Sequence, residues 1–158
     1  MTSRVLVALR IAAPPSRVFE AFTAEIGEWW RPNDLFQSSR RADGRVSLEP
    51  GVGGRLLATR VDGGVEEIGE VLAWEAPDRL VFSWRPTSFA PDQETEVHVH
   101  FEPVDGITRV VVEHFGWDRI PQDHTARHGF PLNRLQQRLA EWWQDLLASL
   151  DERSTGAR

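Results

Sequence analysis

The feature that most constrains the fold is an amphipathic segment near the C-terminal end of the chain, residues 131–152. Its apolar residues recur at steps of three and four, which is the spacing of one face of an α-helix. These residues are Leu132, Leu135, Leu139, Trp142, Trp143, Leu146, Leu147 and Leu150. Charged residues, among them Arg138, Glu141 and Asp145, fall on the opposite face. An apolar face this wide needs a large partner surface, so we expect a long helix packed against the strand-rich remainder of the chain.

Outside this segment, the hydrophobic pattern predicts strands, interrupted early by two short helices. Alternation and turn residues place the strands at residues 4–11, 46–48, 55–61, 66–74, 80–85, 94–102 and 107–115. Ser16 is expected to cap the first short helix, and Pro32 is expected to end the second. Residues 33–45 show little periodicity and are predicted to form a mobile loop. The element order predicts an α+β fold, with a curved antiparallel sheet of about six to seven strands around the C-terminal helix.

Length and composition indicate one globular domain. With 158 residues, of which 41% are hydrophobic and 27% charged, the chain can bury a substantial core. We expect a single domain over residues 1–152 and a disordered tail over residues 153–158. The chain does not open like a signal peptide, and no segment reaches the roughly 18 apolar residues of a membrane span. We therefore expect a cytoplasmic protein.

The residue types that are missing exclude several kinds of site. There is no cysteine, which excludes disulfides, thiolate metal sites and a cysteine nucleophile. All 18 basic residues are arginine, and the lack of lysine excludes lysine Schiff-base catalysis and a phosphate-binding P-loop. The net charge of −6, with arginines scattered along the chain, argues against a nucleic-acid-binding surface. We expect no cofactor and no nucleic-acid partner.

Alternation along the strands also predicts which side chains face the core. Two inward-facing sets are expected: Leu80, Phe82 and Trp84 in one strand, and Val110, Val112 and His114 in the last strand. An inward imidazole at position 114 could bond to a ligand, or act as a general acid or base. The other interpretation is a core histidine whose nitrogens are satisfied by the backbone or by water.

Two pairs of histidines have spacings that a shared metal ion could use. His98 and His100 lie two residues apart in a strand and would point the same way. Glutamates flank them and no third ligand has a fixed spacing, so we expect a solvated surface and no metal site. His124 and His128 could pair across one helical turn, but we expect a solvated turn before the long helix.

Four stretches, taken in order, are typical of one protein family. They are Ala21 through Pro32 with its Trp-Trp-Arg-Pro end; Gly53-Gly54-Arg55 followed by Asp62-Gly63; Gly69-Glu70-Val71-Leu72 with Ala76 through Trp84; and Gly106 through His114 with the later Gly129-Phe130-Pro131. Together they resemble the START-like, or SRPBCC, superfamily, in the branch similar to the C-terminal domain of the Hsp90 ATPase activator. The resemblance implies a helix-grip fold with a hydrophobic cavity between the sheet and the C-terminal helix. It implies no single reaction, because the superfamily includes lipid carriers, hormone receptors, cyclases and co-chaperone domains.

From such a cavity we expect binding of a small hydrophobic or aromatic molecule, lipids included. The expected lining is Trp29, Trp30, Phe36, Phe82, Trp84, Val110, Val112, His114, Trp117, Leu139, Trp142 and Trp143. Burying ~200 Å² of ligand would contribute about 5 kcal/mol before ordering costs. The loop at residues 33–45 could act as a lid over this space.

Two alternatives stay open at this point. One is an enzyme on the same scaffold, of the polyketide cyclase or dehydratase kind or a hydrolase, in which His114 moves protons. The other is a protein-interaction domain in the co-chaperone style. The co-chaperone role itself is not expected, because it would need a separate N-terminal domain that the sequence lacks. The expected partner is a small hydrophobic molecule, and a homodimer is left open.

Overall fold

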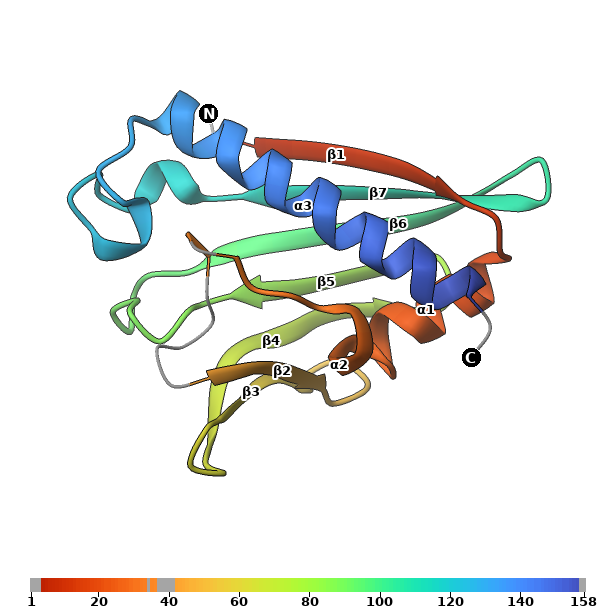
Figure 1. The fold of residues 1–158 in the computed structure, drawn as a ribbon, viewed down its shortest axis with the longest axis horizontal. Helices are drawn as coiled ribbons and strands as arrows, with labels where there is room; N and C mark the ends of the chain where they lie inside the picture. The colour runs from red at the N-terminus through yellow and green to blue at the C-terminus, as the bar shows by residue number, and fades with distance from the viewer. Residues whose placement is uncertain (1–3, 34, 37–41, 157–158) are drawn as a thin grey trace.

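The computed structural model describes residues 4–33, 35–36 and 42–156, in which a long helix crosses one face of a curved sheet (Figure 1). The strands are β1 (Arg4–Ile11), β2 (Ala42–Leu48), β3 (Arg55–Arg60), β4 (Val65–Glu75), β5 (Arg79–Trp84), β6 (Thr95–Val104) and β7 (Ile107–Phe115). The helices are α1 (Pro15–Thr23), α2 (Ile26–Trp29) and α3 (Leu132–Thr155), with 3-10 turns η1 (Trp117–Arg119) and η2 (Thr125–Arg127). This architecture confirms the predicted α+β fold, in which an antiparallel sheet curves around a C-terminal helix.

The seven strands form one antiparallel sheet in the order β1-β7-β6-β5-β4-β3-β2. Strands β2 to β7 follow one another as a meander. Strand β1 forms one edge of the sheet beside β7, where Val7 lies opposite Val112. The register shifts where β3 meets β4 and again where β4 meets β5. Such bulges increase the local twist and bend a strand. The bent sheet therefore has a concave face that receives α3.

Gly69 allows β4 to pass close to its neighbour in this bent region. A Cβ atom added at position 69 would lie 2.0 Å from the carbonyl oxygen of Ser83 and 3.4 Å from the Cβ of Leu56. Glycine within a strand is typical of such a close backbone approach. A side chain at this position would push β4 away from β5 and change the curvature of the sheet.

The apolar face of α3 is buried against the concave face, as its spacing predicted. The buried side chains are Leu135, Leu139, Trp142, Trp143, Leu146, Leu147 and Leu150. Leu132, the first residue of the helix, is only partly buried. Each fully buried leucine contributes about 2 kcal/mol relative to an exposed one. This face supplies much of the core that holds the helix to the sheet.

Three charged side chains hold the C-terminal end of α3 to the α1–α2 region, and we call them the charged junction. The Glu25 carboxylate accepts from Arg17 Nη1 and from Arg153 Nε, both at 2.7 Å. Arg17 Nη2 also donates to the carbonyl of Arg153 at 3.0 Å, one of the carbonyls that a helix end leaves without an intrahelical partner. The hydrogen bond from Arg17 is the main cause that lowers the pKa of Glu25.

The helix ends later than the sequence pattern predicted, and the charged junction explains why. The sequence pattern ended it at residue 152 and assigned residues 153–158 to a disordered tail. The helix instead continues to Thr155, and Ser154 is buried. Its last turn is stabilised by partners more than a hundred residues away in sequence, Arg17 and Glu25, which no local pattern reveals. Residues 157–158 lie outside the described residues.

The first short helix begins differently from the prediction. Pro14 occupies the N-cap position, Pro15 is the first helical residue, and no side-chain cap bond forms. The expected cap from Ser16 is therefore wrong. Proline suits the first turn of a helix because its fixed φ is already helical and it has no N–H left unpaired. The second helix, α2, is a single turn that ends at Trp29, with Trp30 in an extended conformation after it.

The predicted loop at residues 33–45 is partly a strand. Strand β2 begins at Ala42, which pairs with Arg60 of β3, and an irregularity follows before Val46. The sequence pattern missed this part because strand pairing here depends on the backbone of β3 and not on side-chain alternation. Residues 34 and 37–41 lie outside the described residues, so the lid hypothesis for this segment stays a prediction.

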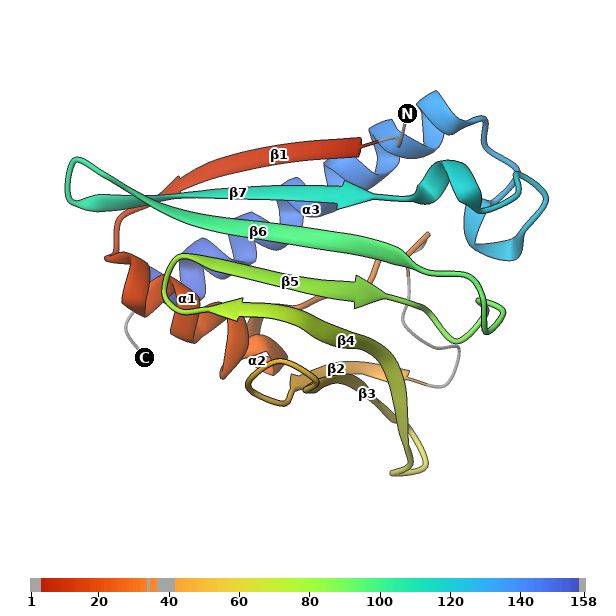
Figure 2. The ribbon, with the colours of Figure 1, turned by 180° about the vertical axis from the view of Figure 1, so that it is seen from behind.

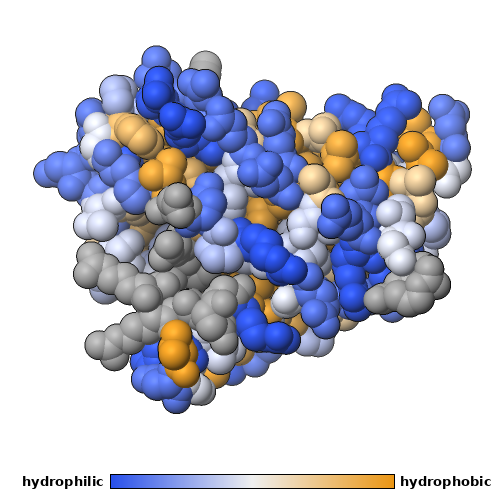
Figure 3. All heavy atoms as spheres, in the orientation of Figure 1, coloured by the Kyte–Doolittle hydropathy of each residue, from blue (hydrophilic) through white to orange (hydrophobic). Residues whose placement is uncertain are grey.

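The two faces of the sheet differ in how they are covered. Seen from behind, the convex face carries none of the helices in the part of the chain that the structure describes (Figure 2). On the opposite side, Figure 3 shows mostly hydrophilic side chains with small, separate hydrophobic areas. None of the helices among the described residues is long and apolar enough to span a membrane. The ordered apolar contacts thus concentrate between the sheet and α3.

Candidate functional site

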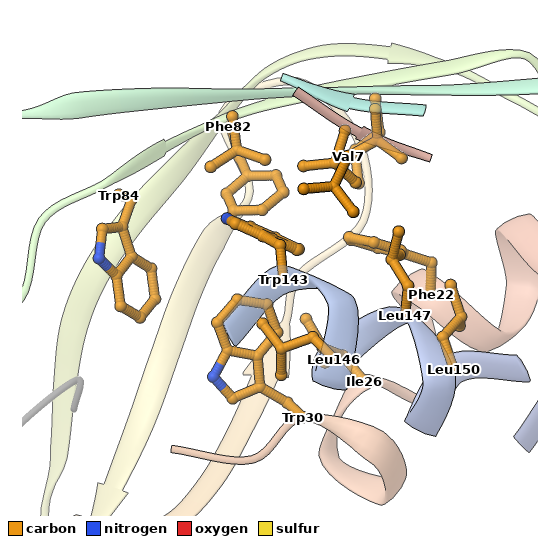
Figure 4. Close-up of a cluster of buried hydrophobic side chains, with 14 of the residues drawn as sticks. Val7, Phe22, Ile26, Trp30, Phe82, Trp84, Trp143, Leu146, Leu147 and Leu150 are labelled. Atoms are coloured by element: carbon orange, nitrogen blue, oxygen red, sulfur yellow. The ribbon is translucent and has the colours of Figure 1, made fainter. Parts of the chain in front are cut away.

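Six tryptophans from four parts of the chain meet between the sheet and α3, and we call them the aromatic cluster. They are Trp29 and Trp30 at the end of α2, Trp84 at the end of β5, Trp117 in η1, and Trp142 and Trp143 in α3. None of the six is more than 2% exposed. Figure 4 shows Trp84 and Phe82 facing Trp143 and Trp30 across the interior. The cluster occupies the space where the sequence predicted a ligand.

Trp30 lies at the centre of the aromatic cluster. Its ring centroid is 5.4 Å from that of Trp84 and 5.6 Å from those of Trp142 and Trp143. The rings of Trp142 and Trp143 meet it at 84° and 87°, the edge-to-face geometry that the aromatic quadrupole favours. Trp30 reaches this position because α2 ends one residue earlier and the chain turns to an extended conformation.

A second group of rings continues the cluster toward η1. Phe36 stacks on Trp142 with centroids 5.2 Å apart and also contacts Trp117 at 6.3 Å. Phe89, from the loop after β5, meets the other side of Trp117 at 5.6 Å. The interior therefore presents aromatic faces continuously from the sheet to the segment that precedes α3.

Four indole N–H groups of the aromatic cluster lie within hydrogen-bond distance of a polar atom of the protein. Trp29 donates to the carbonyl of Ala21 at 2.8 Å, and Trp142 donates to the carbonyl of Arg31 at 2.9 Å. Trp117 and Trp143 both direct their N–H groups at the imidazole of His114. The N–H of Trp30 differs, because it is buried and has no partner among the described residues.

His114 is the polar centre of this region and is only 1% exposed. Its Nδ1 is 3.1 Å from the indole nitrogen of Trp143, and its Nε2 is 3.2 Å from that of Trp117. Its Nε2 also lies 2.8 Å from the hydroxyl of Thr95, which donates to the carbonyl of Trp84 at 3.0 Å. The imidazole therefore links β6, β7, η1 and α3.

Counting protons shows that donors outnumber acceptors around His114. A neutral imidazole has one N–H and one accepting nitrogen, whereas two indole N–H groups point at the ring. Because the Thr95 proton goes to the carbonyl of Trp84, its oxygen is free to accept from Nε2–H. We assign the proton to Nε2 on this ground, so Nδ1 accepts from Trp143. The N–H of Trp117 then faces a protonated nitrogen, which is an unfavourable contact.

His114 is held neutral by its surroundings. Burial lowers the pKa of His114 from 6.5 to about 3. Protonation would place two imidazolium N–H groups opposite two indole N–H groups, in a region without a neighbouring carboxylate among its hydrogen-bond partners. A neutral ring with both nitrogens engaged holds the tryptophans in place and has no free nitrogen for proton transfer in this arrangement.

The structure places every sequence-predicted site residue in the interior. These are Trp29, Trp30, Phe36, Phe82, Trp84, Val110, Val112, His114, Trp117, Leu139, Trp142 and Trp143, none more than 4% exposed. The inward position of His114 is confirmed, and so is the shared inward face of Leu80, Phe82 and Trp84. Contact of any of them with a ligand stays a prediction.

Sequence reasoning missed three residues that organise this region. Thr95 shares the inward face of β6 with Val97, so alternation could have placed it there. Phe89 lies in a loop without periodicity and gave no signal. Arg127 is 5% exposed and donates to the carbonyls of Ile120 and Phe130 at 2.6 and 2.7 Å, which folds the segment before α3 onto the cluster. Burial lowers the pKa of Arg127.

The histidine pairs lie away from this centre, and their partners differ from those of a metal site. The imidazole of His98 contacts Glu96 at 2.9 Å, and that of His100 lies 3.9 Å from Glu113, on the convex face. His124 and His128 each bond to a backbone carbonyl, from Ser88 and Leu35. Among the described residues, no group of three or more histidine, aspartate or glutamate side chains is placed to hold a metal ion.

Solved structures share this fold at low sequence identity. A protein from Bacillus halodurans, solved in solution, is 21% identical with a TM-score of 0.69, over 98% of this chain and 99% of its own. A crystal structure from Mesorhizobium loti is 21% identical with a TM-score of 0.68, over 99% of each chain. An Aha1 dimer from Colwellia psychrerythraea is 18% identical with a TM-score of 0.64, over 99% of each chain. These similarities concern the fold alone.

The family is established by the sequence itself. No curated protein matches the chain. Residues 12–154, however, match the family described as activator of Hsp90 ATPase homolog 1-like protein, in agreement with the motifs between Ala21 and Pro131. The chain therefore belongs to the activator of Hsp90 ATPase homolog 1-like family.

Proposed function

We propose that this protein binds a small hydrophobic or aromatic molecule between the sheet and α3. The observation that carries the proposal is the aromatic cluster, in which six tryptophans from separate elements turn inward at one place. Indole rings present large flat faces and contact flat apolar molecules well. A ligand of this kind would enter by separating rings of the cluster, and its own faces would then pack against rings that otherwise pack against one another.

His114 has a supporting role in this proposal. Its Nε2–H is engaged by Thr95 and its Nδ1 by Trp143, so it orients the ring of Trp143 and does not itself touch the ligand. The same contacts weaken the catalytic alternative, because a general acid or base must reach the proton that it transfers. A cyclase-like or hydrolytic activity would need His114 to exchange one of these partners for a substrate.

The binding proposal is tested by tryptophan fluorescence and thermal unfolding with a panel of apolar aromatic compounds. We expect saturable quenching and a higher melting temperature with at least one compound. Trp84→Phe should weaken binding, because Trp84 contacts Trp30 and Trp142 in the cluster. Trp74→Phe is the matched control, since Trp74 contacts Phe19 outside the cluster. A panel without a single saturable binder would overturn the proposal.

A homodimer is a separate proposal about partners. The Colwellia structure is of a dimer, and the convex face of the present chain carries Leu6 at 51% and Leu72 at 40% exposure. Light scattering behind size exclusion would show a mass near twice 18.0 kDa for a dimer and 18.0 kDa for a monomer. The monomer mass at high protein concentration would refute it.

A further inference from the structure

The indole N–H of Trp30 is the one buried donor of the aromatic cluster that has no polar group within hydrogen-bond distance among the described residues. Trp30 is 2% exposed, so bulk water does not satisfy the group. The comparison with Trp142 is direct, because the two rings touch at 5.6 Å and the N–H of Trp142 has a carbonyl at 2.9 Å. In the described part of the chain, a donor of the cluster with no polar group at all beside it is therefore specific to the ring of Trp30, whereas the N–H of Trp117 at least faces the imidazole of His114.

The surroundings of this N–H specify what could satisfy it. Among the described residues, four rings lie nearest to Trp30, and none of them carries an acceptor oxygen: those of Trp29, Trp84, Trp142 and Trp143. An incoming acceptor would therefore have to be carried by a molecule that itself packs against aromatic rings. A buried donor left unpaired is unfavourable, and pairing it recovers that loss.

The charge of the acceptor is also restricted. Two polar groups lie near Trp30. His114, which reaches it through Trp143, is neutral. The guanidinium of Arg31 is exposed and donates to the backbone carbonyls of Trp30 and Glu28 at 2.9 and 3.1 Å. An anion buried here would lack a cationic partner in the cluster, and an unpaired buried charge is strongly disfavoured. A neutral oxygen, such as an aromatic ketone, fits the site better than a carboxylate or a phosphate.

We propose that Trp30 donates its indole N–H to a neutral acceptor oxygen on the aromatic ring system of the bound molecule. This inference rests on the proposed binding function and names the ligand class, an aromatic compound with a carbonyl or similar oxygen. The aromatic cluster would supply affinity through ring contacts, and Trp30 would supply orientation and selectivity. Molecules of the same shape without the oxygen would leave the N–H unpaired and bind more weakly.

The test uses two probes of nearly identical shape, fluorene and 9-fluorenone, which differ by a methylene and a carbonyl. Wild-type protein should bind fluorenone about five- to tenfold more tightly, the effect of one hydrogen bond. Trp30→Phe should bring the two affinities to within about twofold, since the smaller ring affects both probes alike. Trp142→Phe, whose N–H is bonded to Arg31, should weaken both probes and keep the preference.

The outcomes separate this inference from the proposed function. If both probes bind equally to the wild type, the donor role of Trp30 is overturned while binding stands. If neither binds while another compound of the panel does, the donor role of Trp30 toward an aromatic ketone is overturned and the binding proposal stands; if no compound of the panel binds, both fail. Should Trp30→Phe not fold, indole ¹H–¹⁵N spectra of the wild type provide the second measurement. Fluorenone should shift the Trp30 resonance downfield more than fluorene does, and an equal or absent shift would overturn the inference.

Discussion

Two polar regions attach α3 to the rest of the molecule, and they differ in how completely their polar groups are paired. In the charged junction, Glu25 accepts from Arg17 and Arg153 at 2.7 Å, and solvent reaches all three side chains. Around His114, two indole N–H groups converge on a dry imidazole that can accept only one of them. In the first region each charged group lies beside an opposite charge. The second has one more donor than it has acceptors, and the N–H of Trp30 nearby also lacks a partner among the described residues.

This difference indicates where the molecule can change. The ion pairs at the end of α3 hold the helix in place, and a ligand would add no missing hydrogen bond there. A buried donor without an acceptor inside the aromatic cluster costs free energy, and a ligand that carries an acceptor would remove that cost. Binding is therefore expected in the region whose hydrogen bonds are incomplete, while the charged junction keeps the helix in place.

The largest effect should come from removing the imidazole. His114→Leu leaves the N–H of Trp143 without an acceptor and the Thr95 oxygen without its donor. We expect a loss of about 2–4 kcal/mol in the free energy of unfolding. Urea unfolding measures it. His114→Gln, which keeps one acceptor and one donor, should recover part of the loss. The control His98→Gln on the convex face should change stability by no more than about 0.5 kcal/mol. Equal effects at positions 114 and 98 would contradict the assigned role.

Acid should weaken the His114 region before it weakens the charged junction. The folded-state pKa of His114 is about 3 against 6.5 when unfolded, so below pH 6.5 the unfolded chain binds a proton that the folded chain does not. Stability is therefore full above pH 6.5 and should fall by about 2 kcal/mol between pH 6.5 and 5. The pKa of Glu25 is lowered from 4.5, so its contribution is lost only as pH falls below that value. Urea unfolding across this range should show the first loss in the wild type and not in His114→Leu.

The smallest effect should come from the charged junction. Glu25→Gln removes the charge shared by Arg17 and Arg153, and we expect a loss of about 1–2 kcal/mol, because the three side chains are only partly buried. The loss should shrink in 1 M salt. Glu141→Gln, in an exposed pair with Arg138 on the same helix, is the control and should change stability by at most about 0.5 kcal/mol. Indistinguishable losses for the two variants would show that the junction does not hold the helix end.

The elements that local pattern specifies strongly were predicted well. The three- and four-residue spacing from Leu135 to Leu150 indicated the buried face of α3, and period-two alternation placed Phe82, Trp84 and His114 inside. The prediction failed where the conformation of a segment depends on contacts with residues distant in sequence. Ala42 is in a strand because β3 lies beside it, and the last turn of α3 persists because Arg17 reaches its carbonyls.

The same contrast between local pattern and distant contacts is clearer in the candidate site. Alternation could say that Trp84 and His114 point inward. It could not say that the Thr95 oxygen would accept a hydrogen bond from the imidazole or that Phe89 would contact Trp117. Hydrogen-bond partners within a core come from different elements, and their distances follow from how those elements pack. A histidine on an inward face could therefore be named from the sequence, whereas its engaged nitrogens could not.

By itself, the sequence determined the amphipathic helix, the alternating strands, their order and the family, because each depends on neighbours along the chain. Only the tertiary structure decided which of the inward tryptophans has a partner for its N–H. The indole N–H of Trp142 donates to the carbonyl of Arg31, and that of Trp30 has no partner among the described residues. The physical reason is that hydrogen bonds are short and directional, so that small differences in packing separate a donor with a partner from a donor without one.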